Sequence, residues 1–178
     1  MEVSKESLPS ANFEALAMPL FDQLYNFAHW LTKNREEAED LVQETYTKAL
    51  KGFASFQPGT NFRAWMYRIL RNTFLTSRAG LKATVPIEDE EEPAASPEET
   101  PESLFIASAN RALVQSAIED LPVRFREIIL LGEVEEMSYQ EIAQTLGVPI
   151  GTVMSRLSRA RAALRTAIKE KMEGVQRG

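Results

Sequence analysis

Apolar residues recur at intervals of three and four positions through the first part of the chain. This spacing places their side chains on one face of an α-helix. The first such face consists of Phe13, Leu16, Leu20, Leu24, Phe27, Ala28 and Leu31. Pro19 interrupts the early turns, so the pattern predicts a helix in two pieces.

A second helix is predicted to begin after Asn34, whose side chain can cap its first turn. Its buried stripe consists of Ala38, Leu41, Val42, Thr45 and Ala49. Its other side carries Asp40, Gln43, Glu44 and Thr47. On the residues alone, this side is an acidic face in contact with solvent, without the ligand spacing of a metal site.

The third helical segment, Asn61–Gly80, combines an apolar face with a basic one. The apolar face consists of Phe62, Trp65, Met66, Ile69, Leu70 and Thr73. The opposite side carries Arg63, Tyr67, Arg68, Arg71 and Arg78, with Asn72 near the boundary. We expect Trp65 in the core, because an indole buries a large apolar area. A tyrosine among arginines, with no acid between residues 48 and 83, is suited to binding unstacked bases and phosphates.

Near the C-terminus, two predicted helices are joined by a tight turn. Ser138 and Glu141 form a capping box at the start of the first helix. Gly147 supplies the left-handed residue that ends it, and Pro149 suits the start of the next. In the last helix the buried face consists of Val153, Leu157, Ala160, Leu164 and Ile168.

The far side of this last helix carries Thr152, Ser155, Arg156 and Arg159. The arrangement is that of a helix-turn-helix, whose second helix enters the major groove of DNA. An ordinary helical hairpin with a solvated basic face remains the alternative. Two further helices are predicted before this pair. The apolar residues of the first are Leu113, Val114, Ala117, Ile118 and Leu121, and those of the second are Phe125, Ile128, Ile129 and Leu131.

Residues 83–103 differ from everything around them, with four prolines, eight acidic residues and no period. Such a segment cannot bury enough apolar surface to fold alone, so we interpret it as an extended acidic linker. It separates two predicted helical domains, 10–82 and 104–172. Since strand-like alternation persists nowhere, the predicted fold class is all-α, with a C-terminal helix-turn-helix.

The net charge of −6 conceals alternating blocks of charge. Residues 48–83 carry seven basic and no acidic groups, and residues 147–178 carry seven basic and two acidic groups. Basic patches of this kind can replace the counterions of DNA phosphates. The acidic balance of the whole chain therefore does not exclude nucleic acid as a partner.

Composition excludes several other classes of protein. The chain has no cysteine, which rules out disulfides and thiol chemistry, and no apolar run approaches the length of a membrane span. Its first ten residues lack the features of a secretory signal, so we expect a cytoplasmic protein without membrane insertion. The single histidine, His29, has no second ligand at metal spacing, and we expect no metal or other cofactor. With no glycine-rich phosphate loop or nucleophile elbow, an enzyme is disfavoured.

Several segments together resemble a bacterial RNA polymerase sigma factor of the extracytoplasmic-function group. The segment DLVQETYTKAL resembles the core-polymerase-binding part of that family, and NFRAWMYRILRNTF resembles its promoter-melting helix. The stretch from Leu121 to Leu164 resembles its promoter-binding domain. The resemblance runs from about Phe13 to Lys171 and implies core RNA polymerase, promoter DNA and an anti-sigma factor as partners, in a stress or envelope response.

The resemblance also implies roles for single residues. Core polymerase would meet Asp40, Gln43 and Glu44, supported by Leu41 and Val42. The minus-ten element would meet Arg63, Tyr67, Arg68, Arg71 and Asn72, the last at a position that reads a flipped base. The minus-thirty-five element would meet Thr152, Ser155, Arg156 and Arg159. Arg161 and Arg165 would touch phosphates or a partner protein, and the linker would run through the RNA channel of the polymerase.

A stand-alone helix-turn-helix regulator is the main alternative. It accounts for the C-terminal domain equally well. It gives no role to the arginine- and tyrosine-rich helix of the first domain, or to the acidic face of the helix before it.

Overall fold

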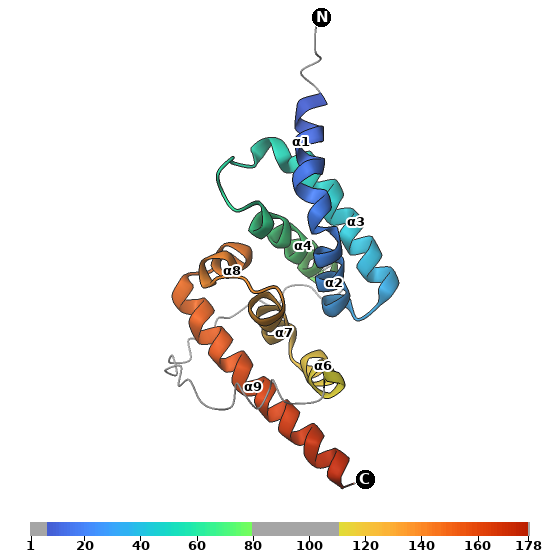
Figure 1. Cartoon of the computed structure of the whole chain (residues 1–178), viewed down its shortest axis with the longest axis vertical. Helices are drawn as coiled ribbons and strands as arrows, with labels where there is room; N and C mark the ends of the chain where they lie inside the picture. Colours follow the sequence, from blue (N-terminus) through green and yellow to red (C-terminus); the bar gives the residue numbers. More distant parts are fainter. Residues whose placement is uncertain (1–6, 80–110, 178) are drawn as a thin grey trace, which may run out of the picture. The chain divides into compact units, whose positions relative to one another are not determined.

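The structure, a computed structural model, describes residues 7–79 and 111–177 of the chain (Figure 1). These residues are helical or lie in short connections, with no strand among them, which confirms the all-α prediction. The chain divides into two compact units. Residues 7–79 form the body of the first unit and residues 111–177 that of the second, and each is described by itself. The predicted linker, 83–103, lies outside the described residues.

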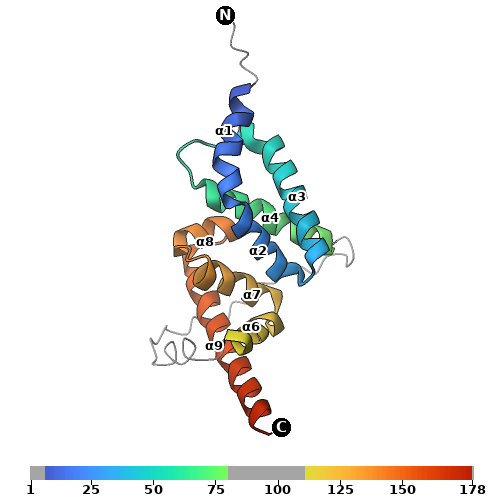
Figure 2. The ribbon, with the colours of Figure 1, turned by 45° about the vertical axis from the view of Figure 1, so that its right-hand side comes forward.

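The first unit is a bundle in which α3 packs against both α2 and α4 (Figures 1 and 2). Its elements are α1 (Ser7–Ala17), a 3₁₀ turn η1 (Met18–Leu20), α2 (Phe21–Thr32), α3 (Arg35–Gly52), a 3₁₀ turn η2 (Phe53–Ser55) and α4 (Phe62–Ala79). The break predicted at Pro19 is confirmed, since η1 separates α1 from α2 there.

Helix ends in the first unit follow from capping residues. The side chain of Asn34 accepts a hydrogen bond of 3.1 Å from the backbone N–H of Glu37, as predicted. Asn61 does the same for the N–H of Ala64, at 2.9 Å. Each cap satisfies one of the backbone donors that a helix start leaves unpaired.

The core of the first unit contains the predicted stripe of α3 in full: Ala38, Leu41, Val42, Thr45 and Ala49 are all buried. Two other expectations were wrong. Leu16 is exposed, and Trp65 is only half-buried. Trp65 instead joins an aromatic cluster, with ring centroids 5.1 Å from Phe56 and 5.6 Å from Phe62.

The second unit is organised around the long helix α9, which packs against α6 and α7. Its elements are α6 (Arg111–Asp120), α7 (Val123–Ile129), a π-helical turn η3 (Leu130–Val134), α8 (Tyr139–Leu146) and α9 (Ile150–Gln176). The predicted buried face of α9 is confirmed at every position: Val153, Leu157, Ala160, Leu164 and Ile168. A Cβ at Gly132 would lie 3.5 Å from Leu157 and 3.7 Å from Ile142, so side chains of α9 and α8 meet over η3.

The turn between α8 and α9 has the predicted chemistry. The backbone N–H of Glu141 donates to Ser138 Oγ at 3.1 Å. Gly147 has φ 68°, the left-handed conformation that ends α8. Pro149 caps α9, which begins at Ile150. The helical spacing of Tyr139 with Ile142 and Leu146 suggests a buried position, but Tyr139 is exposed in the first turn of α8.

Candidate functional site

The outward side of α3 carries the polar residues predicted to dock on a partner. Asp40, Gln43 and Glu44 are exposed, whereas Leu41 is buried beneath them. Glu44 forms an exposed ion pair of 3.2 Å with Lys48, one turn along the helix. A pair of this kind is screened by solvent and leaves the carboxylate accessible to a partner.

The structure separates these residues into two surfaces, one on each side of α3. Asp40, Leu41 and Glu44 line a hollow of about 280 Å³, which we call the α3–α4 hollow. Its other lining residues are Thr32, Glu37, Phe74, Ser77 and Arg78. Gln43 instead lies on a groove of about 700 Å³, the α2–α3 groove. That groove is also lined by Met18, Phe21, Tyr25, Arg35, Glu39, Val42, Tyr46 and Thr47.

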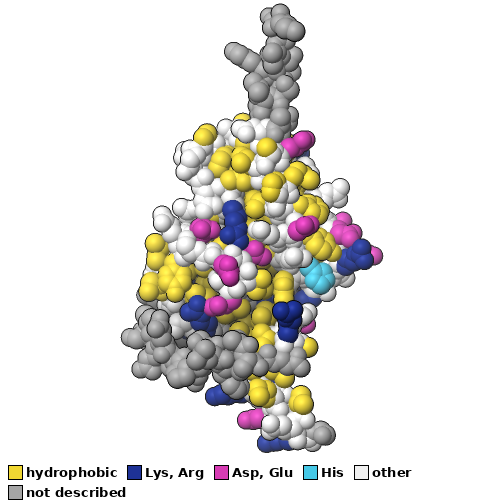
Figure 3. All heavy atoms as spheres, in the orientation of Figure 1, with side chains coloured by type: hydrophobic (Ala, Val, Ile, Leu, Met, Phe, Trp, Pro, Cys, Tyr) yellow, Lys and Arg dark blue, Asp and Glu magenta, His cyan; other side chains and the backbone are white. Residues whose placement is uncertain are grey.

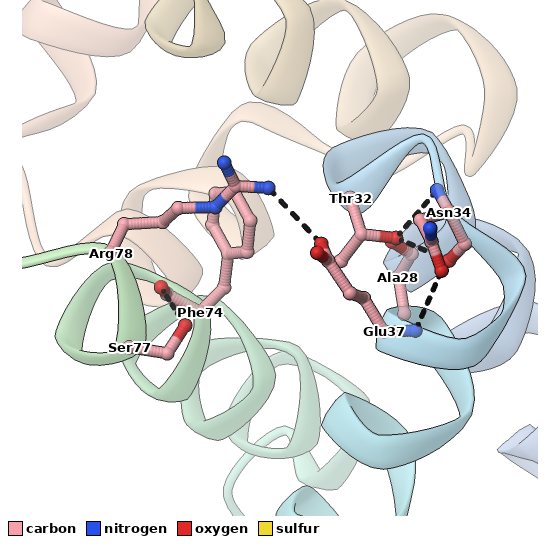
Figure 4. A network of polar contacts seen from close by, with 7 residues as sticks. All are labelled: Ala28, Thr32, Asn34, Glu37, Phe74, Ser77 and Arg78. Carbon is pink, nitrogen blue, oxygen red and sulfur yellow. Dashed lines mark hydrogen bonds and ion pairs between the residues drawn. The ribbon is translucent and has the colours of Figure 1, made fainter. Parts of the chain in front are cut away.

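Polar contacts hold the walls of the α3–α4 hollow together (Figure 4). Arg78 Nη2 lies 3.3 Å from Glu37 Oε2, and the guanidinium carbon lies 5.2 Å from the centroid of the Phe74 ring. On the α2 side, Thr32 Oγ1 donates to the carbonyl of Ala28 at 2.9 Å. The ion pair joins the end of α4 to the start of α3 at the rim of the hollow, whereas the other two contacts each lie within one helix.

The α2–α3 groove combines an apolar floor with a polar rim. Met18 and Phe21 are exposed apolar residues, and hydrophobic side chains are visible across the surface of the first unit (Figure 3). The hydroxyl of Tyr46 donates to the carbonyl of Ala17 at 2.6 Å. Burial raises the pKa of Tyr46 to about 12, and the Asp22 carboxylate contributes to the rise. An apolar patch with a polar rim is the usual composition of a protein-docking surface.

The basic face of α4 is narrower than predicted. Arg68 and Asn72 are exposed and Arg63 is half-buried, but Tyr67 is 0% exposed and Arg71 is buried. The expectation of an accessible Tyr67 and Arg71 is therefore corrected. The physical reason is that α2 packs on this edge of α4.

The tyrosine ring lies 5.2 Å from the ring of Phe27, centroid to centroid. Arg71 follows Tyr67 by one helical turn and so falls on the same covered edge. Arg63 precedes Tyr67 by one turn, and its guanidinium carbon lies 5.7 Å from the centroid of the tyrosine ring. This contact is a cation–π interaction that fixes the arginine over the buried ring.

On α9, the predicted recognition residues also differ in accessibility. Thr152, Ser155 and Arg159 are partly exposed, whereas Arg156 is only 5% exposed. The expectation that Arg156 lies on the far side is corrected. It follows Val153 by three residues and precedes Ala160 by four, so helical geometry places it at the flank of the buried face.

Sequence reasoning missed two apolar residues at the start of α9. Ile150 and Met154 are exposed, and only their position just after the turn could have drawn attention to them. Arg161, considered for phosphate contact, lies 2.7 Å from Glu133 of η3 in an exposed ion pair. From Gln144 to Lys169 the sequence contains no acidic residue, so this end of the second unit is basic.

Metal sites and membrane-spanning helices are absent from the described part of the chain. No group of three or more His, Cys, Asp or Glu residues in it could hold a metal ion. His29 is exposed and its ring stacks on Tyr25, with centroids 6.4 Å apart. None of the helices described is both long enough and apolar enough to cross a bilayer.

Known protein families match both units. Residues 16–83 match the family described as Sigma-70 region 2, and residues 111–164 match Sigma-70, region 4. The chain is 37% identical to the ECF RNA polymerase sigma factor SigE of Mycolicibacterium smegmatis, over 93% of this chain and 69% of that protein. It is 35% identical to the ECF RNA polymerase sigma factor EcfG of Rhodopseudomonas palustris, over 83% and 86% of the two chains.

Solved structures share the fold. The sigma factor RpoE of Bartonella quintana, in complex with the anti-sigma factor NepR, has a TM-score of 0.65 and 32% identity. The alignment covers 89% of this chain and 97% of that one. CnrH, solved with the cytosolic domain of CnrY, has a TM-score of 0.63 at 24% identity and supports the fold alone.

A helical unit ending in a capped turn and a long basic helix defines a helix-turn-helix protein of the DNA-binding class. The family matches in both units and the sequence identity to SigE and EcfG define the family within that class. The chain belongs to the sigma-70 family of RNA polymerase sigma factors, in the extracytoplasmic-function group, which confirms the resemblance stated from the sequence.

Proposed function

We propose that this chain is a promoter-specificity subunit that binds core RNA polymerase, directs it to particular promoters and assists in opening the DNA. The observation that carries this proposal is that relatives named as sigma factors match it across both units. We propose that the chain performs no catalysis itself and acts beside the polymerase in the cytoplasm.

For core binding, we propose the two surfaces that flank α3. The exposed carboxylates of Asp40 and Glu44 would meet basic groups of the polymerase at the rim of the α3–α4 hollow. Gln43 and the apolar residues of the α2–α3 groove would bury partner side chains. Leu41 would support the hollow from below, and Val42 would support the groove. Buried apolar area supplies most of the affinity in such contacts, while charges at the rim chiefly set specificity and association rate.

For the minus-ten element, we propose α4 as the contacting helix. Arg68 and Asn72 are its exposed polar residues, and Arg63 is half-buried beside Tyr67. Tyr67 and Arg71 are buried, so we assign them to positioning rather than to first contact. Extruding a base costs a few kcal/mol, which polar and aromatic groups of the protein must offset.

For the minus-thirty-five element, we propose that Thr152, Ser155 and Arg159 face the major groove. Arg159 can form two hydrogen bonds with guanine, worth about 1–3 kcal/mol of discrimination. Arg156 lies at the flank of the buried face and would act by holding α9 in place. The domain boundaries 10–82 and 104–172 and the acidic linker 83–103 remain part of this proposal.

We further propose control by an anti-sigma factor in a stress or envelope response. RpoE of Bartonella quintana, 32% identical to this chain, was solved in complex with the anti-sigma factor NepR. The exposed apolar residues of the α2–α3 groove give such a partner a surface to cover.

The proposal is tested by the mobility of a promoter duplex with purified chain, with and without core RNA polymerase. We expect a specific complex only when core enzyme is present. Tight, specific binding by the chain alone, unchanged by core enzyme, would instead identify a stand-alone helix-turn-helix regulator.

A further inference from the structure

The first turns of α9 present an apolar pair that the proposed promoter contacts do not use. Ile150 is 47% exposed and Met154 is 44% exposed. Exposing two large apolar side chains to water is unfavourable, so burying either one against a partner would lower the free energy. The two residues lie at the start of the second helix of the helix-turn-helix, the part that approaches base edges.

The spacing of the pair suits successive base pairs. Residues four apart in an α-helix lie on the same side, and about 6 Å separates them along the axis. Base pairs are stacked about 3.4 Å apart along the duplex. The two side chains can therefore reach bases one or two steps apart in the same groove.

Gly151, between them, leaves open space for a partner at this turn. It is exposed and does not have the positive φ of Gly59 and Gly147, so the backbone conformation does not require glycine. Among the described residues, nothing lies within 4 Å of a Cβ built there, so packing does not require it either. A glycine inside a helix costs about 1 kcal/mol relative to alanine. Without a Cβ at this position, a ligand could lie close to the helix backbone.

The pair lies in a stretch without acidic residues, and Met154 is five positions before the partly exposed Arg159, which favours a nucleic acid as the occupant. The sequence from Gln144 to Lys169 has five basic residues and no acidic one. The first turn of α9 also lacks acidic residues, which leaves its positive helix end available to phosphate. In Figure 3, hydrophobic side chains gather at the left edge, over the junction of α8 and α9.

We infer that Ile150 and Met154 read thymine methyl groups in the major groove of the minus-thirty-five element, while Gly151 lets the helix backbone lie close to the DNA. Thymine is the base that presents a methyl group in this groove, and apolar side chains contact it. An isoleucine and a methionine offer base edges no conventional hydrogen-bond donor. The inference rests on the proposed function. It adds to that function the base, thymine, that Ile150 and Met154 would recognise in the minus-thirty-five element.

The test removes methyl groups from the promoter and side chains from the protein. In a promoter bound by the wild-type holoenzyme, each thymine of the minus-thirty-five element is replaced in turn by deoxyuridine, and the Kd of the holoenzyme is measured. We expect a loss of about threefold to fivefold at one or two thymines, the effect of one buried methyl group.

The variants Ile150→Ala and Met154→Ala assign those thymines. Each variant should bind the unmodified promoter less tightly and lose its sensitivity to deoxyuridine at one position, because the partner of that methyl group is gone. Val175→Ala is the matched control, since Val175 is also exposed, at the far end of the same helix. It should keep the full deoxyuridine effect. Circular dichroism of all three variants verifies their helical content.

Gly151→Ala provides a second readout. It should raise the thermal stability of the protein, because alanine favours the helix, yet weaken promoter binding several-fold. Unchanged binding by this variant would overturn the close approach of the backbone.

The inference is overturned if the wild-type holoenzyme is insensitive to every thymine methyl group in the element, or if Ile150→Ala and Met154→Ala retain the wild-type sensitivity. It is also overturned if these variants lose core association rather than promoter affinity, which would make the pair a protein contact. Failure of the wild-type chain to show any core-dependent promoter binding has a different meaning, because it overturns the proposed function as well.

Discussion

At the scale of single residues, the structure differs from the sequence prediction mainly at long or amphipathic side chains. Tyr67, Arg71 and Arg156 were predicted on accessible faces because a helical wheel sorts residues by polarity. Arginine carries an apolar stem and tyrosine an apolar ring, so either can pack at the edge of a core. Their burial depends on the neighbouring helix, which the sequence pattern of one helix does not describe.

The acidic face of α3 yields a prediction for core binding. Asp40→Ala combined with Glu44→Ala should weaken association with core polymerase roughly tenfold, equal to about 1.4 kcal/mol. Both residues are exposed, so the fold should not change. Binding is measured by fluorescence of labelled chain titrated with core enzyme.

The matched control for that pair is Glu170→Ala combined with Glu173→Ala, two exposed acids near the end of α9. It removes the same charge from the second unit and should bind core enzyme as the wild type does. Loss of helical circular dichroism in the Asp40 and Glu44 variant would show that these residues stabilise the fold instead.

Tyr46 yields a prediction for stability. Tyr46→Phe removes the hydrogen bond to the Ala17 carbonyl, so the free energy of unfolding should fall by about 1 kcal/mol. Urea denaturation followed by circular dichroism measures the change. Equal stability of the two proteins would mean that water replaces this bond without cost.

The same residue yields a prediction for pH. The pKa of Tyr46 is raised from 10.0 to about 12 in the folded chain, because burial disfavours the phenolate. The unfolded state therefore loses this proton at lower pH than the folded state does. The contribution of Tyr46 to stability should be complete below pH 10 and decline as pH rises toward about 12. Tyr46→Phe should lack this component of the decline when the two proteins are unfolded by urea at a series of pH values.

At the scale of elements, the apolar pattern predicted helices and their buried faces well where it continued over several turns. The stripes of α3 and α9 were right at every position because each helix spans several turns with an uninterrupted period. The helical spacing of Phe125, Ile128, Ile129 and Leu131 continues into the π-helical turn η3 and did not indicate its wider hydrogen bonding.

The turn of the helix-turn-helix yields a prediction at this scale. Gly147→Ala should lower the free energy of unfolding of the second unit by about 1 kcal/mol, because φ 68° is unfavourable for a residue with a Cβ. Gly174→Ala is the control, since Gly174 lies in α9 without positive φ and should gain slightly in stability. Thermal unfolding of both variants measures the difference. A Gly147 variant as stable as the Gly174 variant would show that the turn tolerates other conformations.

At the scale of the whole molecule, the family could be predicted from the sequence because several motifs occur in the right order. The matches to Sigma-70 regions 2 and 4 confirm this. The arrangement of the candidate site could be predicted only in part. Asp40, Gln43 and Glu44 share one helix, but nothing in the apolar pattern indicated that they border two different surfaces. The exposed pair Ile150 and Met154 was also missed, because apolar residues near a helix start are usually assigned to the core.

Basic and acidic blocks alternate along the whole chain. A chain with a net charge of −6 can bind DNA because its basic residues are gathered in two blocks, one in each unit. In this account the helix-turn-helix selects the site, α4 assists in opening the DNA, and α3 brings both to the polymerase.

Run-off transcription on genomic promoter fragments measures whether this chain directs core RNA polymerase to promoters. Core RNA polymerase, this chain, or both are supplied with nucleotides, and the transcripts are separated by length. We predict a discrete transcript only when core enzyme and chain are both present. An unchanged transcript pattern with and without the chain, together with tight promoter binding by the chain alone, would contradict it.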